Sequence, residues 1–135
     1  MRVFFYGLFM DENLLATKGI EPSEVEMGFV DDYGLRIGKR ATLVRHPSNR
    51  VYGVMMDIAA SDAAELYAEE SVAGYLPEPV IVELMDGTRV EATCYNLPGV
   101  EVTGANNEYA KSLLEVATRL GLPESYLDQI RRARK

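Results

Sequence analysis

One acidic side chain interrupts the apolar face of a predicted helix. The apolar face of this helix, predicted over residues 61–70, is made by Ala63, Leu66 and Tyr67. The next position on that face is Glu70, whereas its neighbour Glu69 falls on the opposite, polar face with Asp62 and Glu65. A carboxylate removed from water holds its proton more tightly, which suits a group that both accepts and releases a proton. Glu70 is therefore the best general acid–base candidate in the chain.

A second interpretation of Glu70 stays open at this point. The end of a helix is uncertain by a residue or more when it is derived from sequence. Glu70 is equally compatible with a frayed last turn, in which its carboxylate turns to water or pairs with Arg40 or Arg45.

Side chains for other kinds of catalysis are scarce. The chain has one cysteine, Cys94, and one histidine, His46, which cannot form a zinc site without two carboxylates. Cys94 shares one face of a predicted strand with Val90 and Ala92, so we expect a buried thiol rather than a nucleophile. We therefore expect no metal and no cofactor, and a chemistry that uses carboxylates, tyrosines and backbone groups.

Length and charge limit the class of protein. The chain has 135 residues, of which 47% are hydrophobic, which indicates a single globular domain over residues 1–135. The net charge of -7 repels phosphate backbones and anionic lipids, so we expect no nucleic acid and no membrane partner. The sequence shows neither a signal peptide nor an apolar run of membrane-spanning length, so the expected compartment is the cytoplasm. A homodimer through an apolar helix or sheet face is compatible with this composition.

Strands and helices are predicted to alternate along the chain. Strands are predicted for residues 3–6, 50–58, 80–85 and 89–95, with two shorter runs between residues 28 and 44 and a turn at residues 47–49. The last two strands form an antiparallel hairpin, because Asp86-Gly87 is typical of a tight turn that needs positive φ. This mixture favours the α+β class over a doubly wound parallel sheet.

Helices are marked by residues that favour helix ends. Besides residues 61–70, helices are predicted over residues 11–17, where Asp11 can cap the first turn, and after Asn106-Asn107 up to Gly121. Pro123 can open a short final helix. The loop of residues 97–105 is interpreted as a connector rather than as a lid.

Several short motifs follow one another along the whole chain. They are Tyr6-Gly7 after a strand, Ala41-Thr42-Leu43, Val51-Tyr52-Gly53-Val54, Leu66-Tyr67-Ala68-Glu69-Glu70-Ser71-Val72, Asn107-Glu108-Tyr109 and Gly121-Leu122-Pro123-Glu124-Ser125-Tyr126. In this order they resemble the gamma-glutamylcyclotransferase family. The resemblance implies that family's fold, which is a small mixed, largely antiparallel, barrel-like sheet with flanking helices.

The resemblance also implies which residues form a site. The family's acid–base glutamate falls on Glu70. Its substrate-binding positions fall on Tyr6, Gly7 and Leu8, whose backbone NH groups would hold the glutamyl moiety, and on Tyr75 and Tyr109. From the residues alone, Tyr75 is equally compatible with an aromatic at a hairpin edge, and Tyr109 with the first core residue of its helix.

The sequence departs from the family pattern at two places. Family members usually continue the Tyr-Gly motif with polar residues, whereas this chain has Leu8-Phe9-Met10. The family's glycine after the glutamate is Ser71 here, which removes a residue that tolerates positive φ. Backbone donors survive the first change and side-chain donors do not, so the departures affect the expected substrate more than the expected fold.

The activity implied by the resemblance is the cyclisation of a gamma-glutamyl amide to 5-oxoproline, with release of the free amine or amino acid. This is an acyl transfer of the cyclising-lyase type, in which the substrate supplies its own amine nucleophile. Glu70 would move the proton, and NH groups near Gly7 and Leu8 would stabilise the oxyanion. Tyr75 and Tyr109 would hold the substrate bent for ring closure.

Two alternatives remain open from the sequence. The first is a non-catalytic ligand-binding or interaction domain on the same scaffold, in which Leu8-Phe9-Met10 accepts an apolar ligand or a partner chain. The second is a cyclotransferase that acts on a larger gamma-glutamylated biosynthetic intermediate, because Leu8 and Phe9 would suit an apolar leaving group.

Overall fold

Strands and helices alternate along the chain in the computed structural model, which describes residues 1–98 and 104–133. The elements are β1 (Arg2–Phe5), η1 (Leu8–Met10), α1 (Glu12–Thr17), β2 (Ser23–Ile37), β3 (Ala41–Asp57), α2 (Ala60–Leu66), η2 (Glu70–Val72), β4 (Leu76–Leu84), β5 (Arg89–Asn96), α3 (Asn107–Leu120) and α4 (Glu124–Ala133). Part of the predicted connector, residues 99–103, and the last residues, 134–135, lie outside the described residues.

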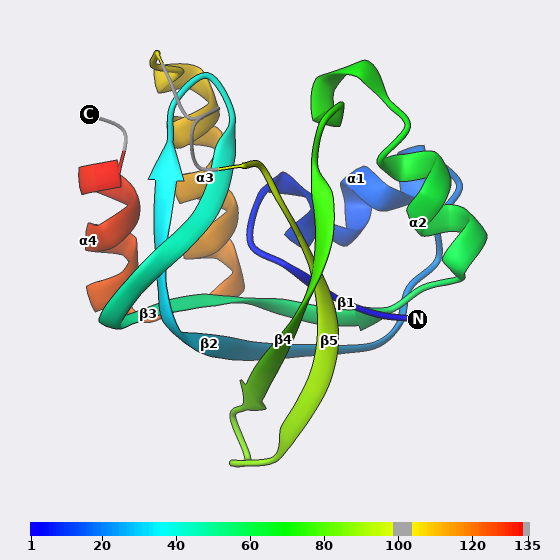
Figure 1. Ribbon diagram of the computed structural model, residues 1–135, viewed down its shortest axis with the longest axis horizontal. Coiled ribbons are helices and arrows are strands. Elements are labelled where there is room, and N and C mark those ends of the chain that lie inside the picture. Colours follow the sequence, from blue (N-terminus) through cyan, green and yellow to red (C-terminus); the bar gives the residue numbers. More distant parts are fainter. Residues whose placement is uncertain (99–103, 134–135) are drawn as a thin grey trace.

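The strands close into a barrel in the order β1-β3-β2-β4-β5. All neighbours pair antiparallel except β1 and β5, which pair in parallel where Val3 lies opposite Thr93. In Figure 1, α1 and α2 lie on one side of the barrel, and α3 and α4 lie on the other. The α+β class and the small, largely antiparallel barrel with flanking helices are therefore confirmed.

The core fills the barrel and the space under the helices. Apolar side chains from every strand are buried in it, among them Val3, Leu35, Val51, Val82 and Ala92. The Cys94 thiol is also fully buried, which confirms the expectation of a core cysteine. Burial raises the pKa of this thiol to about 12, so it stays protonated near neutral pH.

Local turn and cap signals were sufficient for the β4–β5 hairpin and for most helices. Gly87 has φ of 90°, and its amide donates to the carbonyl of Leu84 at 2.9 Å, as expected for the predicted tight turn. Asp11 caps α1 by accepting from the amide of Asn13 at 2.9 Å. The helix α3 ends at Gly121 with φ of 79°, as predicted. Among the described helices, none has the length and apolarity needed to cross a membrane.

The β2–β3 pair differs from the sequence prediction. We expected short runs before residue 44, a turn at residues 47–49 and a separate strand after it, but β2 and β3 are long, continuous strands. Residues 46–49 form a bulge opposite Asp32, where Asp32 and Ser48 adopt φ of 68° and 66°. The Asp32 carboxylate accepts from the Ser48 amide at 3.2 Å, and Pro47, which has no NH to donate, fits at such an irregularity.

The helix α2 also differs from the prediction, which placed its end near Glu70. It ends at Leu66, with Tyr67 as its C-cap residue, and Glu70 instead opens the short helix η2. A helix in a protein is stabilised mainly by packing of its apolar face. Beyond Tyr67 that face would offer only a carboxylate to bury, so the chain leaves the helix there.

Candidate functional site

A pocket lies where η1, η2, the turn between β2 and β3, and the start of α3 meet. Its volume is about 560 Å³. Its lining includes all of the residues assigned to a site from the sequence, namely Tyr6, Gly7, Leu8, Glu70, Tyr75 and Tyr109. The structure therefore brings together segments from the beginning, middle and end of the chain around one cavity.

The Tyr6-Gly7 loop enters the pocket through its backbone. The Tyr6 ring is 6% exposed, and its hydroxyl donates to the carbonyl of Tyr95 at 2.8 Å, so this phenol belongs to the barrel wall. Gly7 precedes η1 and lies against Tyr109: a Cβ atom at Gly7 would be 2.6 Å from the Tyr109 hydroxyl oxygen. Only glycine allows this close approach of the loop to the phenol.

The Tyr109 and Tyr75 phenols lie beside backbone groups. The Tyr109 hydroxyl is near the Leu8 amide, and burial raises the pKa of Tyr109. The Tyr75 hydroxyl donates to the carbonyl of Ala41, and burial raises the pKa of Tyr75 to about 12, although the nearby Arg40 guanidinium opposes this shift. Both phenols therefore stay protonated and neutral near neutral pH.

The adjacent carboxylates of Glu69 and Glu70 both line the pocket, which corrects the sequence prediction. We expected Glu69 in solvent, with Glu70 either buried or turned to water, and the structure has Glu69 half-buried and Glu70 exposed. Lys18 donates to both Glu69 carboxylate oxygens, at 2.8 and 2.9 Å. The chain leaves the helical register after α2, so the two faces of a helix no longer separate these residues.

Glu70 has a different environment from Glu69. Among the ion pairs of residues 1–98 and 104–133, none includes Glu70. The arginines considered as partners are engaged elsewhere: Arg40 donates to the carbonyl of Ala73, and the Arg45 guanidinium lies 4.8 Å from the centre of the Tyr33 ring. The Glu70 carboxylate is therefore available to a ligand in the pocket.

Aromatic side chains form part of the wall, and Tyr67 and Tyr95 among them were not assigned to the site from the sequence. Tyr67, interpreted as a core residue, is half-buried and stacks on Tyr95 with ring centres 3.9 Å apart. Phe9 packs edge-on against Tyr67 at 6.0 Å. The departure from the family at Leu8-Phe9-Met10 thus has a structural reason, because η1 packs onto this cluster and buries Met10.

Lys39 at the turn between β2 and β3 and Asn106 at the start of α3 were missed, and Arg40 was considered only as a partner of Glu70. Lys39 and Arg40 line the pocket together with Asn106. The Asn106 amide group donates to the carbonyl of Lys39 at 3.2 Å, and its oxygen accepts from the amide of Tyr109 at 2.9 Å. One side chain thus joins the turn to the start of α3, and the helix start predicted after residues 106–107 was the available signal.

No metal site is evident in the part of the chain that the structure describes, where no group of three His, Cys, Asp or Glu side chains could hold a metal ion.

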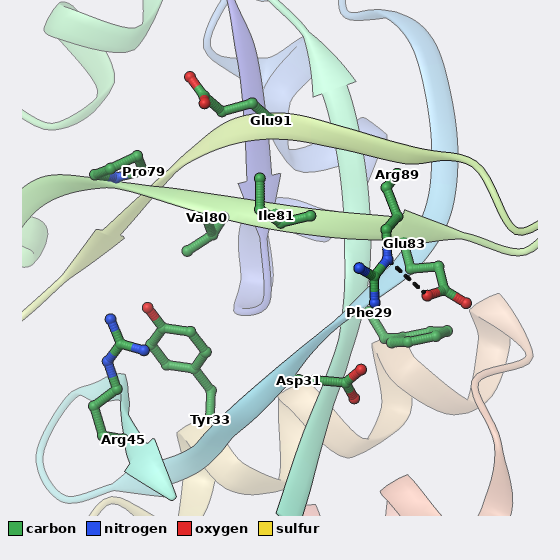
Figure 2. A pocket seen from close by; sticks show the side chains of 10 residues that line it. All are labelled: Phe29, Asp31, Tyr33, Arg45, Pro79, Val80, Ile81, Glu83, Arg89 and Glu91. Atoms are coloured by element: carbon green, nitrogen blue, oxygen red, sulfur yellow. Dashed lines mark hydrogen bonds and ion pairs between the residues drawn. The ribbon is translucent and has the colours of Figure 1, made fainter. Parts of the chain in front are cut away.

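A second pocket, of about 460 Å³, lies where β2 and β4 separate beyond Phe29 and Glu83. Figure 2 shows its lining, in which Arg89 pairs with Glu83 at 3.3 Å. It contains none of the residues assigned to a site from the sequence.

The comparison with protein families shows to which family this chain belongs. The model of the AIG2-like family matches residues 50–130, which is more than half of the chain. The chain therefore belongs to the AIG2-like family, and its fold is that of the gamma-glutamylcyclotransferases. The resemblance derived from the short motifs is confirmed. By sequence, no functionally curated protein matches this chain significantly.

Solved structures share this fold at low sequence identity. A structure named gamma-glutamyl cyclotransferase has a TM-score of 0.77 and 18% identity, over 96% of this chain and 85% of that one. An uncharacterized human protein has a TM-score of 0.79 and 20% identity over the same shares. A yeast gamma-glutamyl cyclotransferase specific to glutathione has a TM-score of 0.65 and 14% identity, over 99% of this chain and 96% of that one.

Proposed function

We propose that this protein is a cyclotransferase that converts a gamma-glutamyl amide to 5-oxoproline and releases the free amine or amino acid. The observation that carries the proposal is the pocket itself. It places the Glu70 carboxylate, the Gly7 loop and the Tyr75 and Tyr109 phenols around one cavity. Family membership and the shared fold support the same class of activity.

In the proposed reaction the substrate reacts with itself. Its α-ammonium gives a proton to Glu70, and the freed amine nitrogen forms a bond to the γ-carbonyl carbon. The amide C–N bond then breaks and Glu70 returns the proton to the departing nitrogen, so that one carboxylate serves both steps. The second proton, which the ring nitrogen loses as the lactam forms, protonates the released amine. The products are 5-oxoproline and the protonated amine, with no water, metal or redox partner consumed.

Hydrogen-bond donors near Gly7 would stabilise the oxyanion that forms on the attacked carbonyl. The Leu8 amide and the Tyr109 hydroxyl lie near each other, and burial keeps the phenol protonated. Donors that are fixed before the reaction need no reorganisation, and losing one such donor costs about 3 kcal/mol in the transition state. The bent substrate conformation, held against Tyr75, would supply the orientation needed for ring closure.

The test is conversion of gamma-glutamyl dipeptides and gamma-glutamylamines, with 5-oxoproline measured by mass spectrometry. Glu70→Gln keeps the size of the side chain and removes the base, so we expect it to abolish turnover while the circular dichroism spectrum is unchanged. Glu65→Gln is the matched control, because Glu65 is exposed on α2 and does not line the pocket. Normal turnover by a folded Glu70→Gln variant would refute the assigned role.

The same assay separates the proposal from a non-catalytic binding domain. Binding of a gamma-glutamyl compound without 5-oxoproline formation would favour the binding domain. Glu69→Gln tests the neighbouring carboxylate, and we expect it to retain turnover because Lys18 already neutralises Glu69 in the pocket wall.

A further inference from the structure

The residues that line the pocket fall into two groups of different character. The first group is apolar and comes from η1, α1 and the end of α2, and its members are Leu8, Phe9, Leu14 and Tyr67. The second group comes from the turn between β2 and β3 and carries the positive charges of Lys39 and Arg40. Each group is held together by its own contacts, so the difference is built into the fold.

In the apolar group, Phe9 is fixed edge-on between Phe5 and Tyr67, at 5.9 and 6.0 Å between ring centres. Leu14 is half-buried and lies one helical turn before Lys18, so the two side chains are neighbours on the helix surface. Lys18 is the cation of this group, and it is already paired with Glu69. This part of the wall therefore offers apolar surface and no unsatisfied positive charge.

In the charged group, the guanidinium of Arg40 lies 5.4 Å from the centre of the Tyr75 ring and donates to the carbonyl of Ala73. Lys39 is exposed beside it, and its backbone is held by Asn106. The charges of this group suit a carboxylate. The glutamyl moiety carries a carboxylate and an ammonium, which match this group and Glu70, so the apolar group is left for the amine part of the substrate.

We propose that Leu8, Phe9, Leu14 and Tyr67 form the leaving-group subsite, and that it selects gamma-glutamyl amides of apolar, uncharged amines over those of amino acids. This inference rests on the proposed function. An amino acid as leaving group would bring its carboxylate against apolar side chains and next to Glu69, where it would lose water without gaining a free cation. The bond that breaks is the same amide C–N bond, and the released amine leaves with the proton carried by Glu70.

The test compares kcat/KM for four L-glutamic acid γ-amides, those of methylamine, butylamine, phenethylamine and phenylalanine. Each methylene that becomes buried raises kcat/KM about fourfold, so we expect butylamide to exceed methylamide by about tenfold or more. Phenethylamide and gamma-glutamylphenylalanine differ only by a carboxylate, and we expect the amide without it to be about tenfold better. Equal values, or a preference for gamma-glutamylphenylalanine, would overturn the inference.

Variants in the pocket wall provide a second test, in which kcat/KM for two substrates is compared within one protein preparation. The ratio of the two values does not depend on the fraction of active enzyme in that preparation. Leu14→Asn should reduce the preference for butylamide over methylamide. Glu69→Gln leaves the Lys18 charge uncompensated, so it should shift preference toward gamma-glutamylphenylalanine, and adding Lys18→Met should reverse that shift. Glu65→Gln, away from the pocket, should leave both ratios as they are. Ratios that do not respond to Leu14→Asn and Glu69→Gln would contradict the subsite.

Different results would contradict the proposed subsite and the proposed function. If none of the four amides yields 5-oxoproline, the proposed function fails. If 5-oxoproline forms but its rate is indifferent to the apolar part of the amine, the function stands and the subsite does not.

Discussion

The contact between Gly7 and Tyr109 makes a sharp prediction for a double variant. In Gly7→Ala the new Cβ atom would lie 2.6 Å from the Tyr109 hydroxyl oxygen, and its next neighbour, the ring carbon that carries this oxygen, is 3.9 Å away. The backbone of Gly7 has φ of -107°, which any L-residue adopts, so alanine adds no backbone strain. The cost of Gly7→Ala therefore comes from one oxygen atom.

The magnitudes follow from this geometry. Overpacking of this kind lowers the free energy of unfolding by about 1–3 kcal/mol. Tyr109→Phe removes the buried hydroxyl and its polar contact with the Leu8 amide, which costs about 1 kcal/mol. In the double variant the clashing oxygen is absent and the remaining contact at 3.9 Å is an ordinary one. Tyr109→Phe should therefore recover most of the stability lost in Gly7→Ala, a coupling of about 1–3 kcal/mol.

The assay is urea unfolding of the wild type, both single variants and the double variant. Tyrosine fluorescence and circular dichroism can report it, because the chain has no tryptophan. Gly53→Ala is the control, since its Cβ would lie 2.3 Å from the carbonyl oxygen of Phe5, a backbone atom. Tyr109→Phe should not rescue Gly53→Ala. Additive losses in the Gly7 and Tyr109 variants would refute the predicted contact.

Other predictions concern a cap, a thiol and a phenol. Asn106→Ala should lower the free energy of unfolding by about 1 kcal/mol, since it removes the cap of α3, and unchanged urea unfolding would contradict this. The buried Cys94 thiol, with its pKa raised to about 12, should react slowly with a disulfide reagent at pH 8 and quickly in urea, whereas fast labelling of the native protein would count against burial. Because the pKa of Tyr75 rises from 10.0 to about 12 on folding, the unfolded chain loses this proton first, and stability should fall as pH rises from 10 to 12. Tyr75→Phe should make that fall less steep in urea unfolding across this range, and an unchanged slope would contradict the assigned burial.

Features fixed by neighbouring residues could be predicted from the sequence. The hairpin at Asp86-Gly87 and the caps at Asp11 and Asn106 depend on a few adjacent residues that satisfy backbone groups or allow positive φ. The burial of the Cys94 side chain was predicted from the alternation of side chains along its strand. These signals do not depend on what the segment later packs against.

Features that depend on residues far away in the sequence could not be predicted from the sequence. Residues 46–49 are typical of a turn, but pairing with β2 on both sides keeps them within one strand as a bulge. The positions of Lys39 and Arg40 depend on closure of the barrel and on the contact between Lys39 and Asn106, far apart in sequence. No local pattern places these cations in the same pocket as Glu70.

Glu70 shows how both kinds of information meet at one residue. The apolar pattern predicts a helix that continues past Tyr67 and buries this carboxylate, and that geometry is wrong because α2 ends at Leu66. The pocket nevertheless includes Glu70, since η2 returns the chain toward the Gly7 loop. For the proposed reaction, prior burial is not required. A substrate that fills the pocket would itself exclude water from the carboxylate and place an ammonium beside it, so the desolvation that the helix was expected to provide would come from the ligand.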